Sequence, residues 1–168
     1  THFKTLLAQV NYARRLTPGG LELRARLYGQ WADSLLYSGE RFSAGGESTV
    51  RGYRENLLLG DRGITGSLEL AQPVRLSGRQ GATRGFDWGA FTVSAFADGA
   101  KLRNVEAPHP GSGIYSVGGS LAWTPSDAVS ARVTYGHALK DVEAAGRRDI
   151  QDDGLQFRLT VHPLRLIR

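Results

Sequence analysis

The amino-acid sequence predicts an all-β protein, an antiparallel transmembrane β-barrel, and three observations lead to this prediction. First, apolar and polar residues alternate with a period of two in about seven segments, which is typical of strands with one apolar face. Second, glycine is abundant, at 22 of 168 residues, and no segment has a convincing helical period. Third, each segment spans about 9 to 11 residues, which suits a tilted membrane-crossing strand.

The strand-like segments follow one another along the whole chain. The opening segment, with Leu6, Ala8, Val10 and Tyr12, fits the alternation less cleanly than the others. The clearer segments are residues 21–31, 64–70, 91–98, 115–124, 129–135 and 155–161. Aromatic residues lie near strand ends on the apolar face: Trp31, Tyr115, Trp123 and Tyr135. Aromatic residues are expected at these positions where a barrel meets the membrane interfaces.

The connections between the strands alternate between short and long. Residues 17–20 and 124–127 form tight turns, whereas residues 34–63 and 140–153 form long polar loops. Short turns on one rim and long loops on the other are expected of a bacterial outer-membrane barrel. Complete barrels of this class have an even number of strands. We therefore expect residues 1–168 to be the C-terminal part of a larger barrel domain.

Composition limits the chemistry available to the chain. It has no cysteine, which excludes disulfides and thiolate metal sites. Its four histidines, His2, His109, His137 and His162, lack the spacing of metal ligands. Neither a nucleophile elbow nor a phosphate-binding loop is present. The sequence therefore predicts no catalytic residues, no metal site and no cofactor.

Charged residues gather on the polar face of the strands. The set comprises Glu22, Arg24, Arg26, Arg132 and Arg158, in a chain of net charge +5. They could line the water-filled lumen of a membrane barrel, or form the outer face of a soluble barrel that binds single-stranded nucleic acid. The opposite face favours the membrane barrel, because mid-strand residues as small as Ala95 and Gly119 would fill a soluble core poorly.

Several motifs occur in a fixed order in the central part of the chain. They are Gly45-Gly46, Thr49-Val50-Arg51-Gly52-Tyr53, Gly60-Asp61-Arg62-Gly63 at the start of a strand, and Phe96-Ala97-Asp98-Gly99. Together they resemble the two-partner secretion transporters, which are outer-membrane barrels of the hemolysin secretion/activation type preceded by periplasmic POTRA domains. The resemblance implies a location in the bacterial outer membrane and about seven strands of a sixteen-strand barrel.

The resemblance also implies a function without enzyme chemistry, in which a pore passes an unfolded exported polypeptide through its lumen. The partners would be that polypeptide, of the hemolysin or adhesin type, the outer-membrane lipid and POTRA domains upstream in the same chain, with no nucleic acid. One alternative is an assembly factor of the same superfamily, although Tyr53 rather than Phe after Arg51-Gly52 favours secretion. The soluble nucleic-acid binder is the other alternative.

In such transporters the long loop folds back into the barrel, which would place residues 34–63 inside the lumen. The arginine of the tip Val50-Arg51-Gly52-Tyr53 would then pair with Asp98 of the motif that also contains Phe96 and Gly99. The strand alternation independently assigns Asp98 to the polar face. Glu69, on the same face, is a second possible partner of Arg51. Gly52 allows the backbone to turn tightly.

Overall fold

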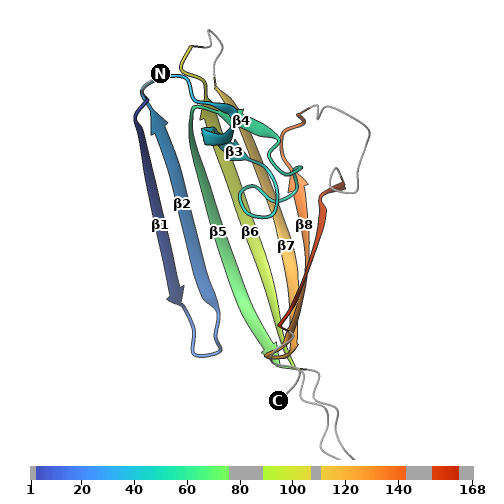
Figure 1. Ribbon diagram of the computed structural model, residues 1–168. Coiled ribbons are helices and arrows are strands. Elements are labelled where there is room, and N and C mark those ends of the chain that lie inside the picture. The colour runs from blue at the N-terminus through green and yellow to red at the C-terminus, as the bar shows by residue number, and fades with distance from the viewer. Residues whose placement is uncertain (1–2, 76–88, 107–110, 143–152, 163–168) are drawn as a thin grey trace, which may run out of the picture.

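The computed structural model describes residues 3–75, 89–106, 111–142 and 153–162. Seven strands form one antiparallel sheet in the order β1-β2-β5-β6-β7-β8-β9, and β3 and β4 form a separate two-stranded sheet (Figure 1). Among the described strands, β1 and β9 each pair on one side only, so the large sheet is an open, curved wall. The prediction of an all-β antiparallel chain with about seven strands is confirmed.

The three middle strands of the large sheet are longer than the alternation of apolar and polar residues predicts. They are β1 (Thr5–Arg15), β2 (Glu22–Ala32), β5 (Arg62–Arg75), β6 (Ala90–Arg103), β7 (Ser112–Ser126), β8 (Val129–Ala138) and β9 (Leu155–Val161). β5, β6 and β7 have 14, 14 and 15 residues. β6 and β7 carry buried apolar residues on the otherwise polar face, including Ala100, Leu102 and Ile114. These residues break the period-two pattern, so the sequence predicts shorter strands.

The two faces of the large sheet differ in polarity in the opposite sense to a soluble protein. On the outer face, apolar side chains are exposed at mid-strand, as Leu68 is with 56% of its surface accessible. On the inner face, polar side chains such as Ser67, Asp98 and Ser116 are buried. Exposed apolar and buried polar side chains are expected where the outer face of a sheet contacts lipid.

The segment between β2 and β5, residues 33–61, lies against the inner face and is called the inner loop below (Figure 1). It was expected to be a polar loop, but it contains a 3-10 turn at Ser38–Glu40 and two short antiparallel strands, β3 (Phe42–Ala44) and β4 (Leu58–Gly60). A small core joins it to the wall: Phe42, Ala44, Val50, Tyr53, Ala100, Leu102 and Ile114. Burial of these side chains makes the inner loop a packed element of the fold.

The rims of the sheet differ as expected. Short turns at residues 16–21 and 127–128 lie at one end of the strands, and the inner loop lies at the other end (Figure 1). The turn predicted at residues 124–127 begins later, because β7 continues to Ser126 past an irregularity in register after Trp123. The loop predicted at residues 140–153 falls largely outside the described residues. In the part of the chain that the structure describes, no helix is long and apolar enough to cross a membrane.

Candidate functional site at the loop tip

Arg51 is at the tip of the inner loop, and its side chain is buried against the inner face. Its Nε donates a hydrogen bond to Oδ2 of Asp98 at 2.7 Å, and its Nη2 donates to Oδ1 at 2.9 Å. The backbone N–H of Arg51 also donates to Oδ2, at 3.1 Å. Asp98 lies in the middle of β6. Two parallel hydrogen bonds and a third from the backbone fix both the position and the orientation of the loop tip.

The guanidinium of Arg51 has further partners on β5 and β6. Nη1 donates to Oε2 of Glu69, and Nη2 also donates to Oγ of Ser67 at 3.1 Å. The central carbon of the guanidinium lies 3.5 Å from the centre of the Phe96 ring, which provides a cation–π contact on one face. Every guanidinium nitrogen therefore has an acceptor, which is the condition for burying an arginine without a large desolvation cost.

The charges around Arg51 keep it protonated. Burial alone would lower the pKa of Arg51, because removal from water disfavours the cation. The hydrogen bonds that Arg51 donates to Asp98 and Glu69, together with the negative charges of these carboxylates, outweigh burial and raise the pKa of Arg51 above its ordinary value. Nη1 of Arg24 lies 3.6 Å from Oε1 of Glu69 and adds a second positive charge to the cluster. Arg51 is thus a fixed charge and not a pH-sensitive one.

Gly52 brings the loop backbone against β8. Its φ of +90° lies in the left-handed region that favours glycine. A Cβ on Gly52 would lie 2.6 Å from the carbonyl oxygen of Gly136, and a Cβ on Gly136 would lie 2.6 Å from the nitrogen of Gly52. Sequence reasoning missed Gly136. The signal available in the sequence was its polar-face position in the alternation of this strand. In the structure it pairs in register with another glycine, Gly118.

Tyr53 ties the loop tip to β7 and to the end of β8. Its hydroxyl lies 2.8 Å from the carbonyl oxygen of Tyr115 and 2.9 Å from that of Lys140, and accepts a hydrogen bond from the N–H of Lys140 at 3.2 Å. The single hydroxyl hydrogen can be donated to one carbonyl at a time. The neighbouring Val50 is fully buried in the small core.

Asp61 fixes the base of the inner loop, a role that the sequence analysis did not assign. Its carboxylate is fully buried and accepts hydrogen bonds from the N–H groups of Leu36 at 3.1 Å and Val105 at 3.0 Å. Nε of Arg41 lies 3.6 Å from its Oδ1. The signal in the sequence was its place in the motif Gly60-Asp61-Arg62-Gly63.

The other predicted site residues are Gly99 and the charged residues of the polar face. Gly99 lies on the outer face, where a Cβ would be 2.9 Å from the ring of Tyr115, so it does not join the loop-tip site. Glu22 forms an ion pair with Arg24 at 2.7 Å.

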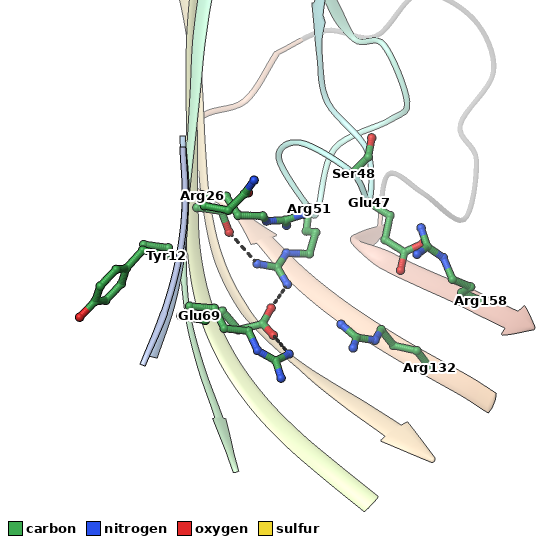
Figure 2. A pocket seen from close by; sticks show the side chains of 13 residues that line it. Tyr12, Arg26, Glu47, Ser48, Arg51, Glu69, Arg132 and Arg158 are labelled. Atoms are coloured by element: carbon green, nitrogen blue, oxygen red, sulfur yellow. Dashed lines mark hydrogen bonds and ion pairs between the residues drawn. The ribbon is translucent and has the colours of Figure 1, made fainter. Parts of the chain in front are cut away.

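A cavity of about 450 Å³ beneath the loop tip is lined by Arg24, Arg26, Arg51, Glu69, Arg132 and Arg158, among others (Figure 2). The described residues contain no cluster of three or more potential metal ligands from His, Asp or Glu.

Comparison with known proteins identifies a family. The family model described as haemolysin secretion/activation protein ShlB/FhaC/HecB matches residues 1–104. The matched span contains the inner loop and, on the wall, Ser67, Glu69, Phe96 and Asp98. The search of curated proteins gave no match.

Proposed function

The chain belongs to the haemolysin secretion/activation protein family ShlB/FhaC/HecB, and we propose that it forms part of the wall of a pore that passes an unfolded exported polypeptide across the bacterial outer membrane. The family is one of bacterial outer-membrane transporters and not of enzymes. Family membership also implies a secreted polypeptide as the substrate. That polypeptide passes in an unfolded state through a lumen bounded by this sheet.

The observation that carries the proposal is the polarity of the sheet. Neighbouring residues on β5 have opposite environments, since Leu68 is exposed on the outer face and Ser67 is buried on the inner face. A wall of this kind separates lipid from a polar interior, and polar walls suit an extended polypeptide whose backbone groups need hydrogen-bonding surroundings. On this proposal, residues 1–168 are part of an outer-membrane β-barrel domain, and further strands pair with the free edges of β1 and β9.

The inner loop has a defined place in this pore. Its position on the inner face, together with the contacts of Arg51 and Tyr53, supports a role in narrowing the lumen. A passing polypeptide would have to move the loop or pass beside it. The polypeptide and the outer-membrane lipid are the partners that this chain itself would contact. Recognition by POTRA domains in the same protein rests on the family alone.

The test uses the full-length protein in cells that lack other transporters of the family. A haemolysin-type polypeptide is co-expressed, its amount in the medium is measured, and the full-length protein is located by membrane fractionation. We expect the protein in the outer membrane and the polypeptide in the medium only when the protein is present. Recovery of the protein in the soluble fraction, or equal release of the polypeptide without it, would contradict the proposal.

A further inference from the structure

Two arginines lie side by side on the inner face, on neighbouring strands. Arg132 of β8 and Arg158 of β9 are partners in the strand register, so their side chains leave the sheet on the same side at opposed positions. Like charges placed directly opposite each other destabilise a sheet unless an anion lies between or above them. Here Oε2 of Glu47, from the inner loop, lies 2.9 Å from Nη2 of Arg158. The structure thus contains a carboxylate bound at one arginine of this pair, Arg158.

The surroundings of this pair carry an excess of positive charge. The cavity beneath the loop tip is lined by five arginines and two glutamates: Arg24, Arg26, Arg51, Arg132, Arg158, Glu47 and Glu69 (Figure 2). Glu69 is already engaged by Arg51 and Arg24. Within the described residues, Arg26 and Arg132 form no ion pair. Figure 2 shows the side chain of Arg132 extending from the wall into the same space as that of Arg51.

The two ends of the loop tip are held by ion pairs of different character. The side chains of Arg51 and Asp98 are 4% and 0% exposed, whereas that of Arg158 is 58% exposed. An exposed ion pair is screened by water and salt and contributes little to stability, so it exchanges its partner readily. The Glu47–Arg158 contact can therefore open while the Arg51–Asp98 contact stays closed.

We propose that Arg132 and Arg158 form a carboxylate-binding site on the pore wall, in which Glu47 holds Arg158 while the loop tip lies against the wall, and which acidic side chains of the exported polypeptide occupy in turn. This inference rests on the proposed function. A guanidinium pair binds carboxylates through geometry that any aspartate or glutamate of an extended chain can satisfy. Because Glu47 is tethered close to the site, its effective concentration there is high, and an entering acidic segment must compete with it.

The test measures block of ion conductance through the full-length protein in planar lipid bilayers. The probes are a ten-residue glutamate peptide, a ten-residue lysine peptide and free glutamate. Free glutamate is used at the carboxylate concentration of the glutamate peptide. We expect the glutamate peptide to block and the lysine peptide not to block. Glu47→Gln should lower the half-blocking concentration of the glutamate peptide several-fold, because it removes the competing carboxylate. The double variant Arg132→Gln/Arg158→Gln should abolish the block.

Two matched variants serve as controls. Arg14→Gln removes a positive charge from the outer face of β1 and should leave the block unchanged, whereas Arg158→Lys should retain part of it. Each variant is first checked for a folded barrel by heat-modifiable migration. An unchanged half-blocking concentration in Glu47→Gln, or normal block in the double arginine variant, would overturn the site. Equal block by free glutamate would overturn its assignment to a polypeptide. Absence of conductance in every folded variant would instead contradict the pore itself.

Discussion

The guanidinium of Arg51 and the carboxylate of Asp98 form two parallel hydrogen bonds, of 2.7 and 2.9 Å, between residues 47 positions apart in the sequence. Both side chains are almost completely buried. The pair joins the tip of the inner loop to the middle of β6, so the loop cannot leave the inner face while the pair is intact.

Loss of either partner of the pair should release the loop tip. Arg51→Ala leaves Asp98 buried without a cation, and the expected cost is about 3 to 5 kcal/mol. Asp98→Ala should have a slightly smaller effect, because Glu69 still holds Arg51, and Glu69→Ala should have the smallest effect of the three. The measurement is protease cleavage of the inner loop in the full-length protein in outer-membrane vesicles, alongside secretion of the co-expressed polypeptide.

The pairing itself is tested by the double variant. If Arg51 and Asp98 act through each other, Arg51→Ala/Asp98→Ala should be little worse than Arg51→Ala alone. Arg51→Lys is the matched control, because it keeps the charge but loses the two parallel hydrogen bonds, and it should restore only part of the protection. Simple addition of the two single effects would show that the residues act independently.

The close approach of Gly52 and Gly136 should tolerate no side chain. Alanine at either position places a Cβ about 0.4 Å inside the shortest contact that real Cβ atoms make, and at Gly52 it also requires a strained positive φ. Each substitution should reduce the free energy that holds the loop tip against the wall by about 1 to 3 kcal/mol or more. Gly39→Ala is the control in the same loop, because its Cβ would meet no atom within 4 Å. Hydrogen exchange of the loop amides measures the effect, and equal exchange in all three variants would contradict it.

The hydroxyl of Tyr53 should contribute separately from its ring. Tyr53→Phe keeps the ring in the small core but removes the hydrogen bonds to the backbone of Tyr115 and Lys140, at an expected cost of about 1 to 3 kcal/mol. The control is Tyr37→Phe, since Tyr37 lies in the same loop with an exposed side chain. The same hydrogen-exchange measurement applies. Faster exchange in Tyr53→Phe only is the expected result, and wild-type exchange in that variant would count against the role of the hydroxyl.

A charged side chain should be unfavourable on the outer face and tolerated on the uncovered part of the inner face. Leu68→Arg or Val133→Arg would place a cation against lipid, which costs about 2 to 4 kcal/mol near the middle of the membrane. Gln9→Arg, at an exposed inner-face position of β1, is the matched control. Heat-modifiable migration of the full-length protein measures barrel assembly. Similar loss of assembly in all three variants would reverse the assignment of the faces.

The sequence by itself determined the strands and their faces. Side chains of a strand point alternately to its two sides, so the period-two pattern is a local property that can be read without knowing the fold. It placed Ser67, Glu69 and Asp98 on the polar face, and the resemblance to the secretion transporters, which rests on the order of the motifs, implied that Arg51 is a partner for that face. The structure brings these residues together at the loop tip.

Only the tertiary structure decided what covers the inner face and how the charges there are divided. Thr134 and Ser67 lie on the polar face of their strands, yet both are buried, and Arg51 of the loop tip donates a hydrogen bond to Ser67. The five charged residues predicted as one lumen lining separate into an ion pair of Glu22 with Arg24, a contact of Arg158 with the loop, and two arginines without an ion pair among the described residues. The physical reason is distance along the chain. The contacts of the loop tip join residues from 16 to 103 positions apart, and no local pattern of polarity encodes which distant segment will fold over a given position.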